Sequence, residues 1–225
     1  MSRGFSFIPV KLRILIVSFL FLFPLVAVRG QDGHGHAVPP TLHALSAAAG
    51  AARATTDGNA VDLNGTTVDP LKTSAGKVVV LIFLRVDCPI SNRYSPTIQR
   101  IIQRVGQENA GRVAFWLVYP DRSESAEQIR RHEREFGYDL PALRDVKRSL
   151  VAESHAQTTP EAAVFDASRK LIYHGRIDNL FEDFGRARPA ATTHELEDAI
   201  HAALDGKVVA NASVAGVGCY ISDLK

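Results

Sequence analysis

The chain has 225 residues, enough for one or two domains. Apolar residues make up 46% and charged residues 22%, as in an ordinary globular protein, so collagen-like, disordered and disulfide-dense classes are excluded. The formal charge is +2, but residues 1–30 contain four bases and no acid. The rest of the chain therefore has 22 of the 26 bases against 24 acids, a net charge of −2. A nearly neutral body predicts no nucleic-acid partner.

Residues 1–30 are typical of a secretory signal peptide. A basic start, which includes Arg3, Lys11 and Arg13, precedes an uncharged apolar run over residues 14–28. Fifteen residues span only about 22 Å as a helix, less than the ~30 Å hydrocarbon core of a bilayer. We expect the segment to be cleaved before Gln31 and the mature protein to be exported, periplasmic or extracellular. If uncleaved, the segment would be the membrane anchor. Paired thiols tend to oxidise outside the cytosol.

Residues 31–56 are expected to form a flexible tether, because glycine, proline and alanine dominate and few residues could form a core. His34 and His36 could bind a metal ion weakly, but a solvated terminus is the favoured interpretation. We expect a domain over residues 57–206 and a C-terminal tail over residues 207–225, which contains Cys219.

Two continuous apolar runs in this domain predict central strands. Residues 78–84 and 113–119 are rich in valine, leucine, isoleucine and aromatic residues, a pattern typical of strands covered on both faces. An Asn-Gly pair at 64–65 between short β-prone stretches predicts a hairpin over residues 62–68.

The remaining elements alternate between helices and strands. Helices are expected after residue 89, with an apolar face at 98–105, and over residues 125–136, 146–156 and 193–204. Residues 162–165 and 171–174 are expected to pair as a hairpin. The order β-α-β-α-β-β-α predicts an α/β fold, with a mixed central sheet and helices on both faces.

Cys88 lies where a buried strand leads into a helix. Free N–H groups and the positive end of the helix dipole stabilise a thiolate at such a position. Pro89 follows at the first helical turn, where its missing N–H has no cost. The alternative is a buried structural thiol, since free cysteine is among the most buried residue types. A reactive thiol is the favoured hypothesis.

Thr159-Pro160 precedes the strand expected over residues 162–165. Proline would remove a ladder donor from a central strand, so it belongs at the start of the strand. A cis peptide bond is compatible with this position.

The run at residues 78–83, the Cys88-Pro89 pair and the Thr159-Pro160 pair together resemble the thioredoxin-like superfamily over residues 57–206. The resemblance implies that Pro160 is the cis-proline facing the reactive cysteine and that the backbone of Thr159 binds an incoming substrate strand or disulfide. A narrower similarity is to exported, peroxiredoxin-like redoxins of the AhpC/TSA type. It rests on the segments Cys88-Pro89-Ile90-Ser91-Asn92, Tyr173-His174-Gly175-Arg176-Ile177-Asp178-Asn179 and Gly218-Cys219-Tyr220-Ile221, the last matching a late Gly-Cys-x-Ile motif.

The sequence departs from this superfamily in two ways. Ser91 stands where thioredoxins have the second cysteine of Cys-x-x-Cys. Leu81 and Arg85 stand where peroxiredoxins have the proline and threonine of Pro-x-x-x-Thr-x-x-Cys. The local dithiol and the threonine that orients a peroxide are therefore both missing from their usual places.

Cys219 is the candidate resolving thiol, 131 residues after Cys88 in a glycine-rich tail. Such a tail could fold over the site or stay mobile. A bridge between the two cysteines would close a loop worth roughly 4–5 kcal/mol in the chain-entropy model. A structural disulfide is therefore almost as well supported as a redox pair.

Helix 125–136 contains His132-Glu133, but the second histidine of a zinc-protease motif is absent, so a solvated charged face is expected there. No metal site and no cofactor are predicted for the domain.

The leading hypothesis is an exported thiol oxidoreductase and antioxidant, acting by thiol–disulfide exchange or peroxide reduction. Cys88 and Cys219 would be catalytic, and Pro89, Ser91, Thr159 and Pro160 would contact substrate. Its partners would be protein or small-molecule thiols, disulfides or peroxides and an external thiol reductant. The alternatives are a non-catalytic binding module with a structural disulfide and, less well supported, a metallochaperone using Cys88 and a histidine.

Overall fold

The computed structural model describes residues 60–223, so the predicted signal peptide and tether lie outside the described residues. The helices are α1 (Pro70–Thr73), α2 (Pro89–Glu108), α3 (Ala126–Phe136), α4 (Ser149–Ser154), α5 (Glu195–Leu204) and the 3-10 turn η1 (Ile221–Asp223). The strands are β1 (Ala60–Asp62), β2 (Thr67–Val68), β3 (Val78–Phe83), β4 (Val113–Tyr119), β5 (Ala142–Arg144), β6 (Thr158–Thr159), β7 (Glu161–Phe165), β8 (Leu171–Gly175), β9 (Phe181–Asp183), β10 (Arg186–Ala187), β11 (Ser213–Val214) and β12 (Cys219–Tyr220).

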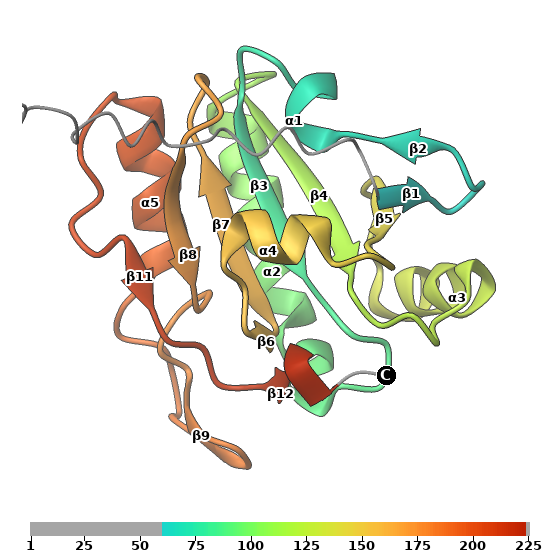
Figure 1. Ribbon diagram of the computed structural model, residues 1–225. Coiled ribbons are helices and arrows are strands. Elements are labelled where there is room, and N and C mark those ends of the chain that lie inside the picture. Colours follow the sequence, from blue (N-terminus) through green and yellow to red (C-terminus); the bar gives the residue numbers. More distant parts are fainter. Residues whose placement is uncertain (1–59, 224–225) are drawn as a thin grey trace, which may run out of the picture. The chain divides into compact units, whose positions relative to one another are not determined.

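Eight of these strands form one mixed sheet in the order β11-β8-β7-β3-β4-β5-β1-β2 (Figure 1). The strands β3, β4 and β5 are parallel neighbours, whereas β7 runs antiparallel to both β3 and β8. The tail strand β11 lies parallel to β8 at one edge. The predicted mixed α/β sheet is confirmed.

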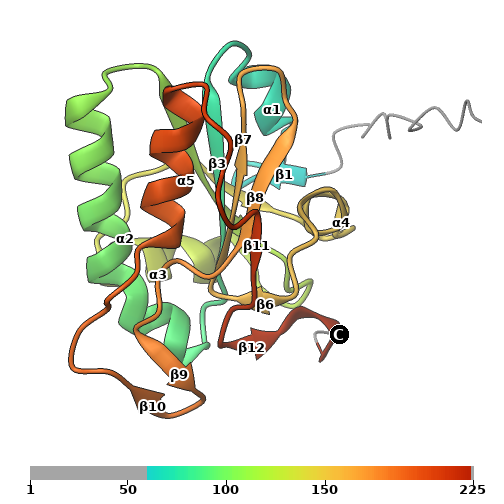
Figure 2. The same ribbon diagram turned by 90° about the vertical axis from the view of Figure 1, so that its left-hand side faces the viewer.

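Strand β3 is buried along its whole length because helices cover both of its faces. Alternate side chains, Val78, Val80 and Ile82, enter one core with α2, α3 and α5. The intervening side chains, Val79, Leu81 and Phe83, enter a second core with α1 and α4. Figure 2 shows α2 and α5 on one side of the sheet and α4 on the other. A strand that is buried on both faces has an uninterrupted run of apolar residues, so the run at residues 78–84 correctly predicted a covered central strand.

Most predicted elements lie where the sequence pattern placed them, but α4 is shorter than residues 146–156. The buried Asp145 carboxylate accepts the N–H groups of Ser149 and Val151, both at 2.9 Å, and so fixes the start of the helix at Ser149. His155, in the left-handed conformation at φ 54°, ends it.

The C-terminal tail is part of the sheet through β11. Gly175 of β8 has φ +143°, and a Cβ at that position would lie 2.0 Å from the Val214 carbonyl oxygen. Only glycine therefore allows β11 to come this close to β8. Within residues 60–223, none of the helices combines the length and apolar content needed to cross a bilayer.

Candidate functional site

The nucleophile candidate lies in the loop that leads from β3 into α2. Cys88 is the N-cap of α2, with extended backbone angles (φ −81°, ψ 113°), and Pro89 is the first helical residue. The Cys88 side chain is fully buried, whereas Pro89 is exposed. The strand-to-helix placement expected from the sequence is what the structure has.

Both backbone groups of Val86 in this loop are hydrogen-bonded by distant side chains. The Val86 N–H donates to the Glu124 carboxylate at 2.7 Å, and the Asn92 side-chain amide donates to the Val86 carbonyl at 3.1 Å. Burial raises the pKa of Glu124 to about 7. These contacts fix the backbone two residues before Cys88.

His132 supports the same loop from α3 and is not on a solvated face, as the sequence analysis expected. Its ring nitrogens lie 2.9 Å from the Asn92 amide oxygen and 2.9 Å from the Tyr119 hydroxyl. Its exposed fraction is 2%, and burial lowers its pKa to about 4. The expectation was wrong for His132 because it shares the core-facing side of α3 with Ile129, although its neighbours in sequence are charged.

The peptide bond between Thr159 and Pro160 is cis and directly faces the cysteine. The Cys88 thiol donates to the Thr159 carbonyl oxygen at 3.1 Å. Beneath this loop, the buried Glu161 carboxylate accepts the N–H groups of Gln157 and Thr158 at 2.8 and 2.9 Å. Glu161 was not predicted as a site residue; its only signal was an acid directly after Pro160 at the start of an apolar strand.

The tail brings the second cysteine to the same place. Strand β12 pairs antiparallel with β6, with Cys219 opposite Thr159. The two sulfur atoms of Cys88 and Cys219 lie 2.9 Å apart. Of the two possibilities for the tail, the structure has the one in which it folds over the site.

Close backbone packing and a hydrogen bond help to hold the tail against the cis-proline loop. A Cβ on Gly218 would lie 2.1 Å from the Thr159 carbonyl oxygen, so only glycine permits this approach. Just after Cys219, Ile221 donates its N–H to the Gln157 carbonyl at 2.8 Å and buries its side chain to 2% exposure in the second core.

The two thiols differ in acidity. Burial opposes ionisation of Cys88, but hydrogen bonds from the Cys219 thiol and from Ser91 outweigh it and lower the Cys88 pKa below its usual 9.0. Burial, the hydrogen bond to Cys88 and the charge on Cys88 raise the pKa of Cys219 to about 12. Of the two thiols, Cys88 is therefore the one that ionises more readily, and Cys219 donates a hydrogen bond to it.

The structure shows what surrounds the three residues that depart from the superfamily patterns. Ser91 is buried in the first turn of α2, and its backbone N–H is among the groups that lower the pKa of Cys88. Leu81 is fully buried inside β3. Arg85 pairs with Asp87 at 2.7 Å and Asp121 at 3.3 Å. A cation held by two carboxylates thus stands where a peroxide-orienting threonine would be.

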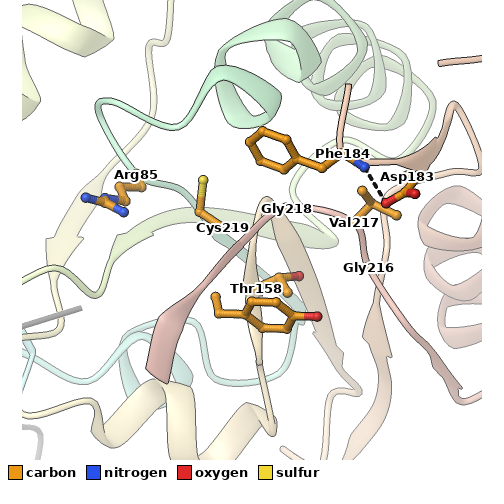
Figure 3. A pocket seen from close by; sticks show the side chains of 9 residues that line it. Arg85, Thr158, Asp183, Phe184, Gly216, Val217, Gly218 and Cys219 are labelled. Carbon is orange, nitrogen blue, oxygen red and sulfur yellow. Dashed lines mark hydrogen bonds between the residues drawn. The ribbon is translucent and has the colours of Figure 1, made fainter. Parts of the chain in front are cut away.

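A cavity of about 480 Å³ opens beside Cys219. We call it the tail groove; it is lined by Arg85, Thr158, Asp183, Phe184, Gly216, Val217, Gly218, Cys219 and Tyr220. In Figure 3 the Cys219 side chain lies between Arg85 and the Phe184 ring. Cys219 is half-buried, whereas Cys88 is fully buried. In the described part of the chain, no three histidine, cysteine, aspartate or glutamate side chains group as metal ligands would.

No family model matches the sequence, and no curated protein matches it. Solved structures do. A hypothetical protein from Sinorhizobium meliloti has a TM-score of 0.58 at 22% identity, covering 72% of this chain and 87% of its own. An uncharacterized conserved protein from Geobacillus kaustophilus has a TM-score of 0.58 at 21% identity, covering 72% and 85%. A secreted Mycobacterium tuberculosis disulfide oxidoreductase, homologous to Escherichia coli DsbE, has a TM-score of 0.46 at 17% identity, covering 64% and 93%.

The fold is thioredoxin-like. Its diagnostic features are the central β3, the cysteine at the start of α2 and the cis-proline that faces it. At these identities the similarity concerns the fold alone.

Proposed function

We propose that the protein is an exported thiol–disulfide oxidoreductase whose redox couple is Cys88 and Cys219. One observation carries the proposal: two sulfurs 131 residues apart in sequence lie 2.9 Å apart across the cis-proline loop. A disulfide needs an S–S distance of about 2.05 Å, so a shift of less than 1 Å would allow the bond to form.

The acidity difference assigns the two roles. The Cys88 thiolate attacks a substrate disulfide, forms a bond to one substrate sulfur and releases the other as a thiolate. Cys219 then loses its proton to that leaving group and attacks the Cys88 sulfur. The Cys88–Cys219 disulfide forms, and the remaining substrate sulfur departs as a thiolate. The protein gives up two electrons and one proton, and the substrate disulfide becomes one thiol and one thiolate.

The other predicted site residues have supporting roles in this proposal. Ser91 stabilises the thiolate, and Pro89 starts the helix whose dipole does the same. The Thr159 carbonyl and the cis-Pro160 bond fix the edge with which β12 pairs. An extended substrate segment would need this same edge, so it would displace β12 before reaching Cys88.

Thiol–disulfide exchange is favoured over peroxide reduction because Arg85, bound to two carboxylates, replaces the threonine that would orient a peroxide. A structural disulfide in a binding module differs from both in its reduction potential. Structural disulfides in secreted proteins have potentials below about −300 mV, whereas exchanging pairs are less negative.

The test is an intact-mass measurement of the purified mature protein, alkylated before and after reduction, followed by a redox titration. We expect no label before reduction, two labels after it, and a potential between about −300 and −120 mV.

Cys88→Ser should abolish reduction of a peptide disulfide while the circular dichroism spectrum is unchanged. Two labels before reduction, or unchanged turnover in Cys88→Ser, would refute the proposal. A potential below −300 mV would favour the structural disulfide, and rapid oxidation by hydrogen peroxide would favour peroxide reduction.

A further inference from the structure

We infer that the tail groove is the docking site for a peptide thiol, and that this thiol attacks the disulfide at Cys219 rather than at Cys88. The inference rests on the proposed redox couple and concerns the half-reaction that returns it to the dithiol. In the first half-reaction the Cys88 thiolate attacks the substrate. In the return half-reaction the attacked sulfur is that of Cys219, and the peptide thiol reaches it through the tail groove.

Access is the first reason. The Cys88 side chain has 0% exposure beneath the tail, whereas Cys219 is half-buried and lines a cavity of about 480 Å³. An attacking thiolate must approach the sulfur that it will bond to. With β12 in place, only Cys219 offers its sulfur to an open space.

The leaving group is the second reason. Attack at Cys219 expels Cys88, which leaves at the N-terminus of α2, where free N–H groups and the helix dipole stabilise a thiolate. Exchange is faster when the departing thiol has the lower pKa. Attack at Cys88 would instead expel Cys219, which lies in the two-residue strand β12.

The step balances as follows. A substrate thiolate forms a bond to the Cys219 sulfur, the Cys88–Cys219 bond breaks, and its electron pair leaves on Cys88. A second substrate thiolate attacks the substrate sulfur in the mixed disulfide and releases Cys219, which takes up a proton. Two substrate thiols become one disulfide, and the protein disulfide becomes a thiolate and a thiol.

The rim of the groove indicates the class of thiol. Of the residues described, three large apolar side chains are exposed: Phe184 and Tyr220 at 61% each, and Val208 at 94%. Both aromatic residues line the groove, and Val208 does not. Exposed aromatic side chains around a cleft mark an interaction site. The partner is therefore a cysteine in a peptide segment with apolar neighbours, and Phe184 contacts one of those neighbours.

The first experiment localises the mixed disulfide. Oxidised, full-length mature protein is mixed with a five-residue peptide whose central cysteine is flanked by leucines, quenched with N-ethylmaleimide within a second, and digested for mass spectrometry. We expect the peptide on Cys219 and the maleimide on Cys88. The peptide on Cys88 would overturn the inference and leave the redox couple intact. If the oxidised protein contains no Cys88–Cys219 bond, the proposed function fails as well.

The second experiment tests the docking site even when no mixed disulfide is trapped. We measure the rate of disulfide reduction by the leucine-flanked peptide, a serine-flanked peptide and glutathione. The leucine-flanked peptide should react at least about fivefold faster than the other two, and Phe184→Ala should abolish this advantage. Val208→Ala is the matched control and should change no rate by more than twofold. Equal rates for the three thiols, or no effect of Phe184→Ala, would overturn the docking site.

Discussion

Cys88 and Cys219 meet at one point, but the molecule holds them by different means. Cys88 is fixed by secondary structure: a central strand before it, a 20-residue helix after it, and side chains from α2 and from beyond β4 that bind the backbone at Val86. Cys219 lies in a two-residue strand, held by a glycine contact on one side and the buried Ile221 on the other.

This difference indicates which partner moves. Local opening is easiest where few buried contacts and few backbone hydrogen bonds hold a segment. The loop before Cys88 is bound at both backbone groups of Val86, whereas β12 depends on its two-residue pairing with β6 and on Ile221. We therefore expect the tail to open and close over a fixed nucleophile. The following predictions test this by weakening the tail, then the thiol pair, then the loop.

Gly218→Val should have the largest effect. Its Cβ would lie 2.1 Å from the Thr159 carbonyl oxygen, a distance that no side chain tolerates, so β12 cannot pair with β6. We expect the rate of Cys88–Cys219 disulfide formation to fall at least about 100-fold, measured by alkylation and intact mass after mild oxidation. Gly106→Ala is the control, because nothing lies within 4 Å of a Cβ there. Gly106 lies in the last turn of α2, away from the site, so this change should leave the rate of disulfide formation as in wild type. Wild-type disulfide formation in Gly218→Val would show that the tail has another route to Cys88.

Ile221→Ala should loosen the tail without blocking it. Truncating a buried isoleucine costs about 2–5 kcal/mol, and here that cost falls on the attachment of the tail. A loss of 2 kcal/mol raises the open population about 30-fold, so alkylation of Cys88 in the reduced protein should accelerate by about that factor. Tyr220→Ala removes the exposed neighbour in the same strand and should change the rate by less than threefold. If Cys88 is alkylated no faster in Ile221→Ala than in wild type, the buried Ile221 side chain does not hold the tail closed.

The same contrast explains what the sequence could predict. Strands β3 and β4 are continuous apolar runs, α3 starts with a Ser125 capping box, and Cys88-Pro89 marks a strand-to-helix junction. These signals are local, so they can be recognised without knowing the rest of the fold. The strands β11 and β12 have two residues each and no periodicity, and their position depends on Gly175, Gly218 and a partner strand elsewhere in the chain.

The site divides in the same way. Cys88, Thr159 and Pro160 could be identified because their motifs are contiguous and the resemblance supplied their relation. Cys219 was a candidate only as the other cysteine, and its pairing with β6 needed the structure. Glu124, His132 and Glu161 were missed because a buried polar side chain in a polar stretch looks like a surface residue until its distant hydrogen-bond partners are known.

Cys219→Ala should raise the pKa of Cys88. Of the influences that lower this pKa, the hydrogen bond from Cys219 is the largest, and without it the opposing effect of burial weighs more. In the reduced wild type, the thiolate absorbance at 240 nm should show one titration below pH 9 and none from Cys219 until about pH 12. Because the folded-state pKa of Cys88 is depressed, its stabilising contribution is present at high pH and lost as the pH falls through that value. Cys219→Ser, whose hydroxyl can still donate, should shift the titration less. Identical titrations in wild type and Cys219→Ala would contradict the assigned roles.

Glu124→Gln should have the smallest effect on the thiols and a measurable one on stability. Burial raises the pKa of Glu124 from 4.5 to about 7, so its contribution to stability is fully present below pH 4.5 and is lost as the pH rises through 7. Glutamine keeps an oxygen for the Val86 N–H and does not titrate. We expect the fall in the free energy of unfolding between pH 4.5 and 7 to become shallower by about 1–3 kcal/mol in urea titrations. The exposed Glu127→Gln makes the same charge change and should leave the slope as in wild type. Parallel profiles for Glu124→Gln and wild type would mean that the Glu124 carboxylate does not titrate with a raised pKa. The rate of Cys88 alkylation in Glu124→Gln should stay within twofold of wild type.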